Sequence, residues 1–475
     1  MGTWDGLSGT CGRDGMSGLA SFASAVFWGV LVLSVLVFVH EGGHFVSARA
    51  FGMRVTEFFL GLPSRFRISF KSRRHGTEFG VTPLLLGGYN RICGMEQEQD
   101  DLLAPALAIV QREGRVAVPD LARELGIDDD RAYGIMACLN DLAAIRPFYD
   151  EEAGEHPWQS AWPLHFETLE RDANLLTEYD PDHDFATAGT TGPGEPRPVD
   201  DQEAFLEHER ARTYQGKGFV ARVVTLLAGP LVNIAMAFLL LVGSLVITGI
   251  EVNTNSNELG GVTEGSLAQD AGIRAGDRIV MFGGHDVSTW TELVDAIDKS
   301  LNEGGDIAVA YERDGQTFET TIVIPDGEKP DLIGVSAKLE VYHPSLVEAS
   351  SYAFSYMRMV GGAVARIIMP QHTMEVMSQS SSIVGISAMA SEAAASGISD
   401  FVLFAAAISM SLGFMNLLPI PPLDGGKILI EVVQLVMRRP LSTRAQSIVS
   451  YVGLAFFLFI FCFALKNDIV RLLGL

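Results

Sequence analysis

The sequence predicts a multi-pass α-helical membrane protein that carries soluble attachments on both sides of the membrane. Its 475 residues are 48% hydrophobic and 19% charged, which is too apolar for a soluble protein of this size. The hydrophobic residues are concentrated in four long runs, and a helix needs about 20 apolar residues to cross a bilayer. An acidic segment and a segment of short strands lie between these runs.

The four apolar runs predict four membrane spans. The first run, residues 18–39, carries no charge. We interpret it as a retained span rather than a cleaved signal peptide, because no small-residue cleavage signal follows it. The other spans are expected at residues 223–250, 401–418 and 448–465.

Lysine and arginine residues predict how the spans are oriented. Basic residues in short loops stay on the cytoplasmic side of a membrane. Such residues follow the first span, precede the second and separate the third from the fourth. This distribution places residues 94–213 in the cytoplasm. Residues 251–400 and both chain termini then lie outside.

The cytoplasmic residues predict three consecutive structures. Residues 54–93 contain the short strand-like runs VTEFF, RFRISF and TEFGVT, closed by Gly87 and Gly88, which predicts a membrane-associated β segment. Residues 94–149 show helical periodicity that is broken at Gly126 and the aspartates after it, which predicts a helix-turn-helix of winged-helix type. Residues 150–213 are rich in Pro, Gly, Asp and Glu, which predicts a flexible acidic linker.

The net charge of −24 is concentrated in the same cytoplasmic part. Residues 93–215 contain 28 of the 58 acidic residues and 9 of the 34 basic residues. A helix-turn-helix invites a DNA-binding interpretation, but phosphate binding needs clustered Lys and Arg. We therefore expect no nucleic acid partner. A cytoplasmic protein is the expected partner of this acidic insert.

Residues 251–345 predict a compact α+β domain outside the membrane. The runs DIAVAYERDG and TFETTIVIP alternate as strands do, and helices are expected to begin at Ser266 and Thr289. The phrase AGIRAGDRI, residues 271–279, resembles a PDZ domain. The predicted segments are an N-terminal tail (1–17), the first span (18–53), the β segment (54–93), the helix-turn-helix (94–149), the acidic linker (150–213), the second span (214–250), the PDZ-like domain (251–345), an external helical connector (346–400), the third span (401–430) and the fourth span with the C-terminus (431–475).

The end of the first span carries the motif HEGGH. Residues i and i+4 lie on one face of a helix, so His40 and His44 can hold one metal ion while Glu41 faces the attacking water. The alternative is a chance helical pattern. Ionisable residues at membrane depth cost about 2.5 to 3.5 kcal/mol each, so this cluster at the end of an uncharged span indicates a bound metal. The ligand types favour zinc but do not distinguish it from every other divalent metal.

A catalytic zinc takes three protein ligands and keeps a fourth position for water. Asp424 is the stronger candidate for the third ligand. It follows three prolines that must break the third span, and a carboxylate held at such a break can meet a metal. Glu57 and Glu78 remain alternatives. Asp424 could also be a capping residue at a helix end.

Four features together resemble the site-2 protease family of intramembrane zinc metalloproteases, and in their order the bacterial regulator of sigma-E protease. They are HEGGH on the first span, AGPLVN at residues 228–233, the PDZ-like domain, and NLLPIPPLDGG at residues 416–426. The resemblance implies a location in the plasma membrane of a bacterium and Zn²⁺ as the cofactor. The implied zinc ligands are His40, His44 and Asp424, with Glu41 as the general base.

The resemblance also implies where the substrate is held. The implied substrate-positioning residues are Asn233, Asn416, Gly87, Gly88 and Tyr89. A helical peptide hides its carbonyls in its own hydrogen bonds, so a protease working in the bilayer must hold its substrate extended. The edge of a sheet can do this by pairing with the substrate as an added strand.

The sequence therefore predicts an intramembrane zinc endopeptidase that performs regulated intramembrane proteolysis. Its expected substrates are single-span membrane proteins, such as anti-sigma factors or signal-peptide remnants, and membrane lipid surrounds it. The PDZ-like domain acts either as a size filter or as a binder of a new C-terminus. The alternative function is a non-catalytic membrane scaffold or receptor that links the PDZ-like domain to the insert. A scaffold predicts a decayed metal site.

Overall fold

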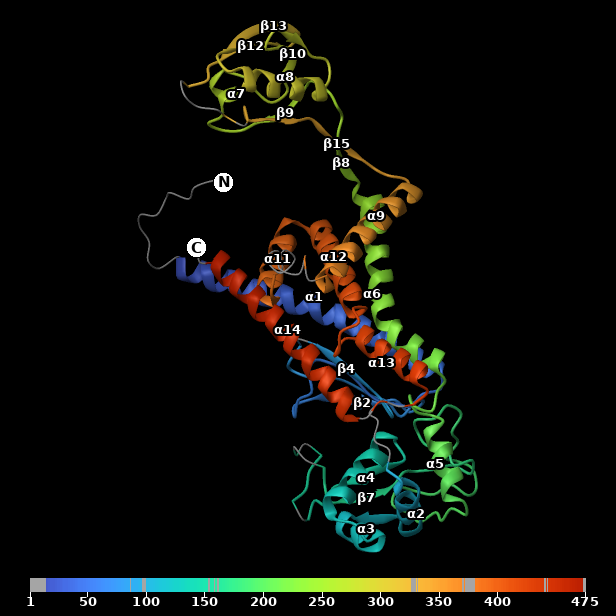
Figure 1. The fold of residues 1–475 in the computed structure, drawn as a ribbon. Helices are drawn as coiled ribbons and strands as arrows, with labels where there is room; N and C mark the ends of the chain where they lie inside the picture. Colours follow the sequence, from blue (N-terminus) through green and yellow to red (C-terminus); the bar gives the residue numbers. More distant parts are fainter. Residues whose placement is uncertain are drawn as a thin grey trace. The chain divides into compact units, whose positions relative to one another are not determined.

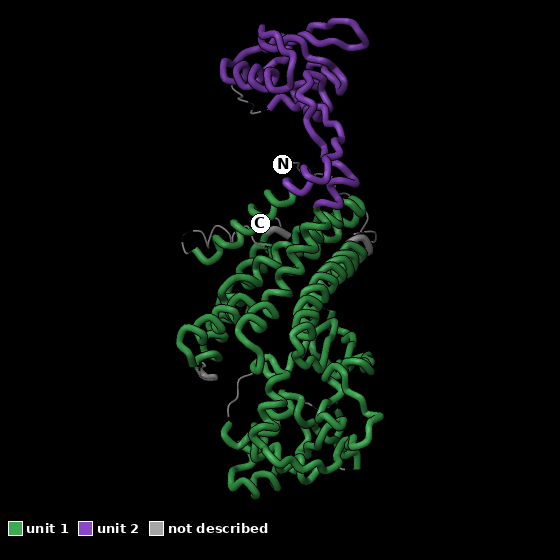
Figure 2. Tube along the Cα trace, turned by 90° about the vertical axis from the view of Figure 1, so that its right-hand side faces the viewer, with its two compact units in different colours: residues 1–241, 353–475 green, residues 242–352 purple. Residues whose placement is uncertain are grey.

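The computed structural model describes residues 14–472, except residues 86, 96–99, 153, 158, 160–161, 326–329, 331, 370, 372–380, 440 and 442. The N-terminal tail predicted for residues 1–17 therefore lies largely outside the described residues. The chain divides into two compact units, shown in Figure 2. Unit 1 comprises residues 1–241 and 353–475, and unit 2 comprises residues 242–352.

Four helices in the described part of the chain are long and apolar enough to cross a membrane, which agrees with the four predicted spans. They are α1 (Asp14–Ala50), α6 (Phe219–Thr248), α12 (Ile398–Asn416) and α14 (Thr443–Leu472). The helix α1 continues past the uncharged run through HEGGH, so the motif lies on the same helix as the first span.

The described residues of the segment predicted as an external connector are largely helical. It contains α9 (Leu346–Ala365), a 3-10 turn η1 (Arg366–Ile368) and α11 (Ile383–Ser396). The apolar helix α11 packs along α1, as Figure 1 shows, and the hydroxyls of Ser24 and Ser391 lie 2.7 Å apart across this contact. In unit 1 the first span is therefore packed against a helix that is too short to be counted as a span.

The third span is broken at its prolines, as predicted. The helix α12 ends at Asn416, and α13 (Asp424–Met437) begins at Asp424. The intervening residues fold back tightly onto the start of α13. A Cβ at Gly425 would collide with the carbonyl oxygens of Leu417 and Leu418, so only glycine permits this approach. This turn places Asp424 at the first position of its helix.

A four-stranded sheet precedes the insert. Its strands are β1 (Val55–Leu60), β2 (Ile68–Lys71), β3 (Glu78–Val81) and β4 (Gly88–Ile92), in the order β2-β3-β1-β4. The pair β1–β3 is parallel, and the pairs β1–β4 and β2–β3 are antiparallel. The sequence predicted the first three strands but treated the glycine pair before Tyr89 as the closing turn. Backbone pairing with β1 makes this segment an edge strand instead.

The opposite edge of this sheet exposes large apolar side chains. Phe66, Ile68 and Phe70 are 79%, 85% and 69% exposed. A surface of this kind is unfavourable in water and marks a site of contact with a partner or a membrane. It supports the prediction that residues 54–93 associate with the membrane.

The inserted segment contains two helices separated by a turn at the predicted break. Its elements are α2 (Leu103–Glu113), β5 (Arg115–Ala117), α3 (Val118–Leu125), α4 (Asp129–Asp141), β6 (Ile145–Phe148) and β7 (His165–Thr168). The helix α3 ends at Gly126, which has a positive φ of 69°, and the Asp128 side chain caps α4 by accepting from the Arg131 backbone N–H. Three antiparallel strands in the order β5-β7-β6 complete the fold. The winged-helix classification stays a prediction.

Residues 150–213 differ from the flexible linker that their composition predicts. They supply β7 and α5 (Gln202–Arg210), and Phe205 lies in the buried core of the insert. Asp180 and Glu209 are 1% and 0% exposed. A polar composition indicates disorder only when the charged groups stay in water. Here they are buried against charges from distant parts of the chain, which composition does not reveal.

Unit 2 is a mixed α+β domain. Its elements are β8 (Ile250–Asn253), β9 (Leu259–Val262), α7 (Leu267–Asp270), β10 (Arg278–Phe282), β11 (His285–Asp286), α8 (Trp290–Glu303), β12 (Ile307–Arg313), β13 (Gln316–Ile322), β14 (Val335–Ala337) and β15 (Leu339–Tyr342). One sheet has the order β11-β10-β12-β13, and β14 and β15 pair with β9 and β8. Ser266 and Thr289 are the N-caps of the two helices, as predicted. The PDZ classification stays a prediction.

Candidate metal centre

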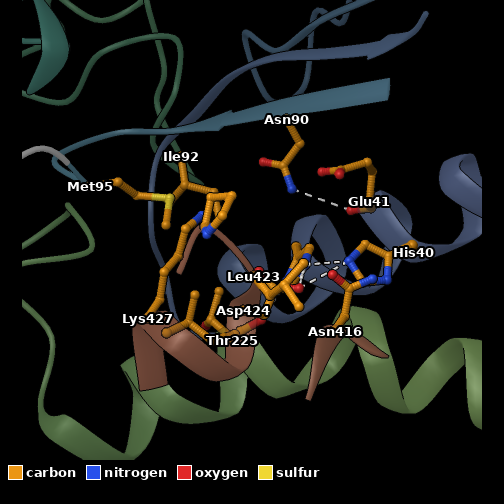
Figure 3. A pocket seen from close by; sticks show the side chains of 13 residues that line it. His40, Glu41, Asn90, Ile92, Met95, Thr225, Asn416, Leu423, Asp424 and Lys427 are labelled. Carbon is orange, nitrogen blue, oxygen red and sulfur yellow. Dashed lines mark hydrogen bonds and ion pairs between the residues drawn. The ribbon is translucent and has the colours of Figure 1, made fainter. Parts of the chain in front are cut away.

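Three buried side chains from two distant parts of the chain converge in unit 1. His40 and His44 lie one turn apart on α1, and Asp424 begins α13. The Nε2 atoms of the histidines are 3.2 Å apart, and the Asp424 Oδ2 atom lies 3.0 Å from His40 Nε2 and 3.2 Å from His44 Nε2. Figure 3 shows His40 and Asp424 meeting in this way.

This triangle of atoms fits a zinc ion. Zinc bonds to nitrogen and oxygen are about 2.0 to 2.2 Å long, so two ligand atoms of a tetrahedral site lie about 3.3 Å apart. The His44 Nδ1 atom lies 2.7 Å from the backbone oxygen of Thr225. Because a carbonyl oxygen can only accept, Nδ1 carries the proton and Nε2 offers its lone pair to a metal.

The ring of His40 is oriented by a buried amide. Asn233 is 0% exposed, and its Nδ2 atom lies 3.4 Å from His40 Nδ1. Its Oδ1 atom is buried without a hydrogen-bond partner among the described residues. A half-turn of the amide exchanges the two atoms, and Oδ1 then accepts the proton that His40 Nδ1 must carry when Nε2 binds a metal. Asn233 thus lies behind His40, which favours an orienting role over the substrate-positioning role implied by the sequence.

Two glycines allow α1 and α6 to approach at this point. A Cβ at Gly229 would collide with the His44 ring and would reach within 2.9 Å of His40 Nε2. A Cβ at Gly43 would lie 2.6 Å from the Ala228 oxygen. Real Cβ atoms do not come this close to backbone. The AGP part of AGPLVN therefore packs directly against HEGGH.

A cavity of ≈ 250 Å³ opens beside the three side chains, and Glu41, Asn90, Asn416 and Lys427 are among the residues that line it. The Glu41 side chain extends into the cavity from α1, toward Asn90 of β4 (Figure 3). The Asn90 Nδ2 atom donates to the Glu41 backbone oxygen at 3.3 Å. This bond holds the edge strand β4 against the helix that carries the motif.

The other predicted substrate-positioning residues lie at different places around the cavity. A Cβ at Gly88 would lie 3.5 Å from Glu41 Cγ, so β4 passes directly beside Glu41. Gly87 precedes β4 and faces Leu62. The Tyr89 ring stacks on Phe59 with 5.3 Å between centroids, which is a packing contact. Asn416 lines the cavity, and its Nδ2 atom donates to the Leu412 oxygen at 3.0 Å.

The alternative third ligands lie elsewhere. Glu57 and Glu78 are register partners on β1 and β3, and Arg67 lies 4.0 and 3.7 Å from their carboxylates. Within the part of the chain that the structure describes, His40, His44 and Asp424 form the group of potential ligands whose atoms lie within 4.8 Å of one another. The sequence offered no signal for Thr225, because its contribution is a backbone oxygen, nor for Asn90, which acts through its position on β4.

Comparison with known proteins shows the family to which the chain belongs. The family model described as peptidase family M50 matches residues 28–460. The chain is 27% identical over 469 residues to the zinc metalloprotease RasP of Shouchella clausii, covering 93% of this chain and 98% of the relative. It is 24% identical over 458 residues to the regulator of sigma-W protease RasP of Bacillus subtilis, covering 95% and 99%. A putative zinc metalloprotease of Lactococcus lactis is 25% identical over 467 residues, covering 93% and 97%. The chain therefore belongs to peptidase family M50, the site-2 proteases, and is a zinc metalloprotease of that type.

Proposed function

We propose that this intramembrane protease cleaves the transmembrane segments of single-span membrane proteins in regulated intramembrane proteolysis. The observation that carries the proposal is the convergence of His40, His44 and Asp424 beside a cavity, on helices that include the first membrane span. A non-catalytic scaffold predicted a decayed metal site, whereas these three ligands remain together. The proposed substrate classes are anti-sigma factors and signal-peptide remnants. The Bacillus subtilis relative is named a regulator of sigma-W protease, which is compatible with the first class.

The residues in and around the cavity have different chemical roles. His40, His44 and Asp424 hold Zn²⁺, which when bound supplies a Lewis acid that polarises the scissile carbonyl and acidifies water. Glu41 extends into the same cavity. It takes a proton from the attacking water and delivers it to the leaving amine, as a general base that becomes a general acid. Asn233 and the Thr225 oxygen hold the two histidine rings in the orientation that this arrangement needs.

The strand β4 holds the substrate in extended form. It is an edge strand of its sheet, it passes beside Glu41 at Gly88, and Asn90 and Ile92 line the cavity. An edge strand presents backbone N–H and C=O groups that can pair with an added strand. Such pairing keeps the substrate unwound, so that its carbonyl is free to react. Asn416, on the other side of the cavity, is a further candidate for contact with substrate.

The protein is a bacterial membrane protein, and we place it in the plasma membrane with unit 2 outside. The basic residues that flank the spans support this orientation, with both termini outside. Residues 94–213 then lie in the cytoplasm, where their acidic surface contacts a protein partner. The PDZ-like unit 2 filters substrates by size or binds a new C-terminus.

The proposal is tested by zinc content and cleavage measured together. The detergent-purified wild type and Glu41→Gln are each expected to contain about one zinc per chain. Cleavage of a model single-span substrate should fall at least about a hundredfold in Glu41→Gln, because a general base contributes about 10²- to 10⁴-fold.

Matched variants identify the third ligand. Asp424→Ala should lose zinc, whereas Glu57→Gln and Glu78→Gln should keep it. Cleavage by Glu41→Gln at the wild-type rate would contradict the assigned base. Retention of zinc by Asp424→Ala would contradict the assigned ligand.

A further inference from the structure

A buried carboxylate that takes no part in the chemistry lies on the same helix as Asp424. Glu431 of α13 is 6% exposed. Its Oε1 atom accepts a hydrogen bond of 3.1 Å from the Tyr214 hydroxyl, and its Oε2 atom lies 3.1 Å from Arg222 Nη2 of α6. A buried carboxylate is strongly destabilising unless it is paired. Tyr214 therefore holds Glu431 by a hydrogen bond and Arg222 by an ion pair, although Oε2 has no hydrogen-bond partner among the described residues.

Glu431 is in a position to control how α13 is rotated about its axis. Seven residues are almost two full turns of an α-helix, so Glu431 and Asp424 lie on the same face, about 10 Å apart along the axis. A side-chain tip lies about 5 to 6 Å from the axis, and a rotation of about 20° therefore displaces it by about 2 Å. Metal coordination tolerates deviations of only about 0.2 Å. A small rotation of α13 is enough to remove Asp424 from the two histidines.

Tyr214 holds Glu431 from the point where the chain returns from the insert. The Tyr214 backbone N–H donates to the Cys93 oxygen at 2.8 Å, and Cys93 in turn donates to the Arg54 oxygen at 3.0 Å. The chain leaves β4 for the insert at Cys93 and comes back from it at Tyr214, so these two hydrogen bonds join the two ends of the insert. Tyr214 belongs to a buried cluster that also contains Met53 and Leu226. The Tyr214 hydroxyl is protonated at neutral pH and acts as the donor, and burial and the nearby Glu431 carboxylate raise its pKa further.

Arg54 ties this junction to the body of the insert. Its guanidinium is 1% exposed and donates to both oxygens of Asp180, at 2.8 and 2.6 Å, and to Glu209 at 2.7 Å. It also donates to the Ala143 oxygen at 3.1 Å, just before β6. The backbone N–H of Arg54 donates to the Arg212 oxygen at 2.8 Å. The position of Tyr214 therefore depends on how the insert packs around Arg54.

We propose that Glu431 is a positioning residue of the metal centre. Through Tyr214, it makes zinc affinity depend on how the inserted segment is packed against the rest of unit 1. The inference rests on the ligands proposed above. Tyr214 and Arg222 hold Glu431, Glu431 sets the rotation of α13, and that rotation presents Asp424 to His40 and His44. The inserted segment is thereby a support of the metal centre as well as a surface for a partner.

The test measures the zinc dissociation constant of the full-length protein in detergent by competition with a chelator. Tyr214→Phe removes one hydroxyl and is expected to weaken zinc binding about tenfold, since loss of a group that orients a ligand costs about 10- to 100-fold in metal affinity. Glu431→Ala, which loses both partners, is expected to weaken it further. A second buried carboxylate provides the control. Asp468 of α14 accepts from the Ser382 N–H and hydroxyl, both at 2.6 Å, and Asp468→Asn should bind zinc as the wild type does.

The outcomes separate this inference from the ligand assignment. Zinc binding within twofold of wild type in both Tyr214→Phe and Glu431→Ala would overturn the positioning role, provided that Asp424→Ala loses zinc. An equal loss in Asp468→Asn would overturn it too, because the effect would then be one of general packing.

Glu209→Gln tests the link to the insert. In this variant the inserted segment should become sensitive to protease, and the zinc affinity of the protein should fall. Unchanged zinc affinity in a protease-sensitive variant would overturn the link.

Discussion

At the scale of single residues, the two glycines of HEGGH occupy very different surroundings. Among the described residues, no heavy atom beyond the adjoining backbone of α1 lies within 4 Å of the place that a Cβ of Gly42 would take. A Cβ of Gly43 would lie 2.6 Å from the Ala228 oxygen of α6. The contact between α1 and α6 is therefore tight at Gly43, whereas Gly42 has open space around it, although both are one residue from a functional side chain.

These neighbours form a matched pair of variants. Gly43→Ala must push α1 and α6 apart next to His44, and we expect cleavage to fall about ten- to a hundredfold, since a displacement on the order of 1 Å can cost about 10²-fold. Gly42→Ala should retain zinc and activity, and its helix should gain about 1 kcal/mol in propensity. Zinc content and the cleavage rate of both purified variants check this. Equal activity of the two would contradict the close approach.

At the scale of elements, a buried ionic cluster holds the insert together and against β1. Arg54 and Arg171 share the Glu209 carboxylate, with Arg171 donating to both of its oxygens at 3.0 Å. Burial opposes the ionisation of Glu209, but the guanidiniums of Arg171 and Arg54 outweigh it and lower its pKa well below the ordinary value. The pKa of Asp180 is lowered in the same way, by Arg54 against the effect of burial. Both carboxylates are therefore charged in the folded insert at neutral pH.

The lowered pKa values give the insert a predictable acid sensitivity. A carboxyl whose pKa is lower in the folded state stabilises the fold above its unfolded pKa, about 4, and this stabilisation is lost as pH falls through the folded value. We therefore expect the insert in the full-length protein to resist limited proteolysis equally from pH 7 to 5 and to open progressively below about pH 4. An acid-stable protease is needed for the lower part of this series.

A pair of substitutions on α5 tests the same cluster at neutral pH. Glu209→Gln is expected to cost about 3 to 5 kcal/mol, because it leaves buried guanidiniums without their partner. Glu207→Gln, two residues earlier, removes a surface pair with Arg210 in which Glu207 is 70% exposed, and should cost less than about 1 kcal/mol. Protease resistance of the insert at pH 7 distinguishes them. Equal resistance in both variants would mean that the buried cluster does not hold the insert.

At the scale of the whole molecule, the proposed function depends on which parts lie on which side of the membrane. In the proposed topology, the substrate meets unit 2 outside the membrane, while the inserted segment contacts a cytoplasmic partner. Both Asp286 in unit 2 and Asp120 in the insert are exposed and outside the candidate spans, so each can carry a probe.

Cysteine labelling of intact cells checks this orientation. In a chain whose native cysteines are replaced by serine, Asp286→Cys should react with a membrane-impermeant maleimide. Asp120→Cys should react only after the membrane is opened. This result is expected because translocation of the loops rich in Lys and Arg is unfavourable. The opposite pattern of labelling would reverse the proposed orientation of every soluble part.

The sequence by itself determined the features that depend on neighbours within a few residues. The apolar runs predicted four spans, the i, i+4 spacing placed two histidines on one helix face, and the prolines before Asp424 predicted a broken helix. Caps at Asp128, Ser266 and Thr289 were likewise local signals. Such signals act through backbone geometry and solvation along a short stretch of chain, and they can be read without knowing what packs against it.

Only the tertiary structure decided which distant groups meet. His40 and Asp424 are 384 residues apart in the chain, and their contact at 3.0 Å separates Asp424 from Glu57 and Glu78 as the candidate third ligand. Tertiary contacts also set three other features: the pairing of β4 with β1, the burial of Glu209 in a segment that resembled a linker, and the bond from Tyr214 to Glu431. Their energies depend on a partner's position in space, and burial makes each of them strong in a way that no local pattern records.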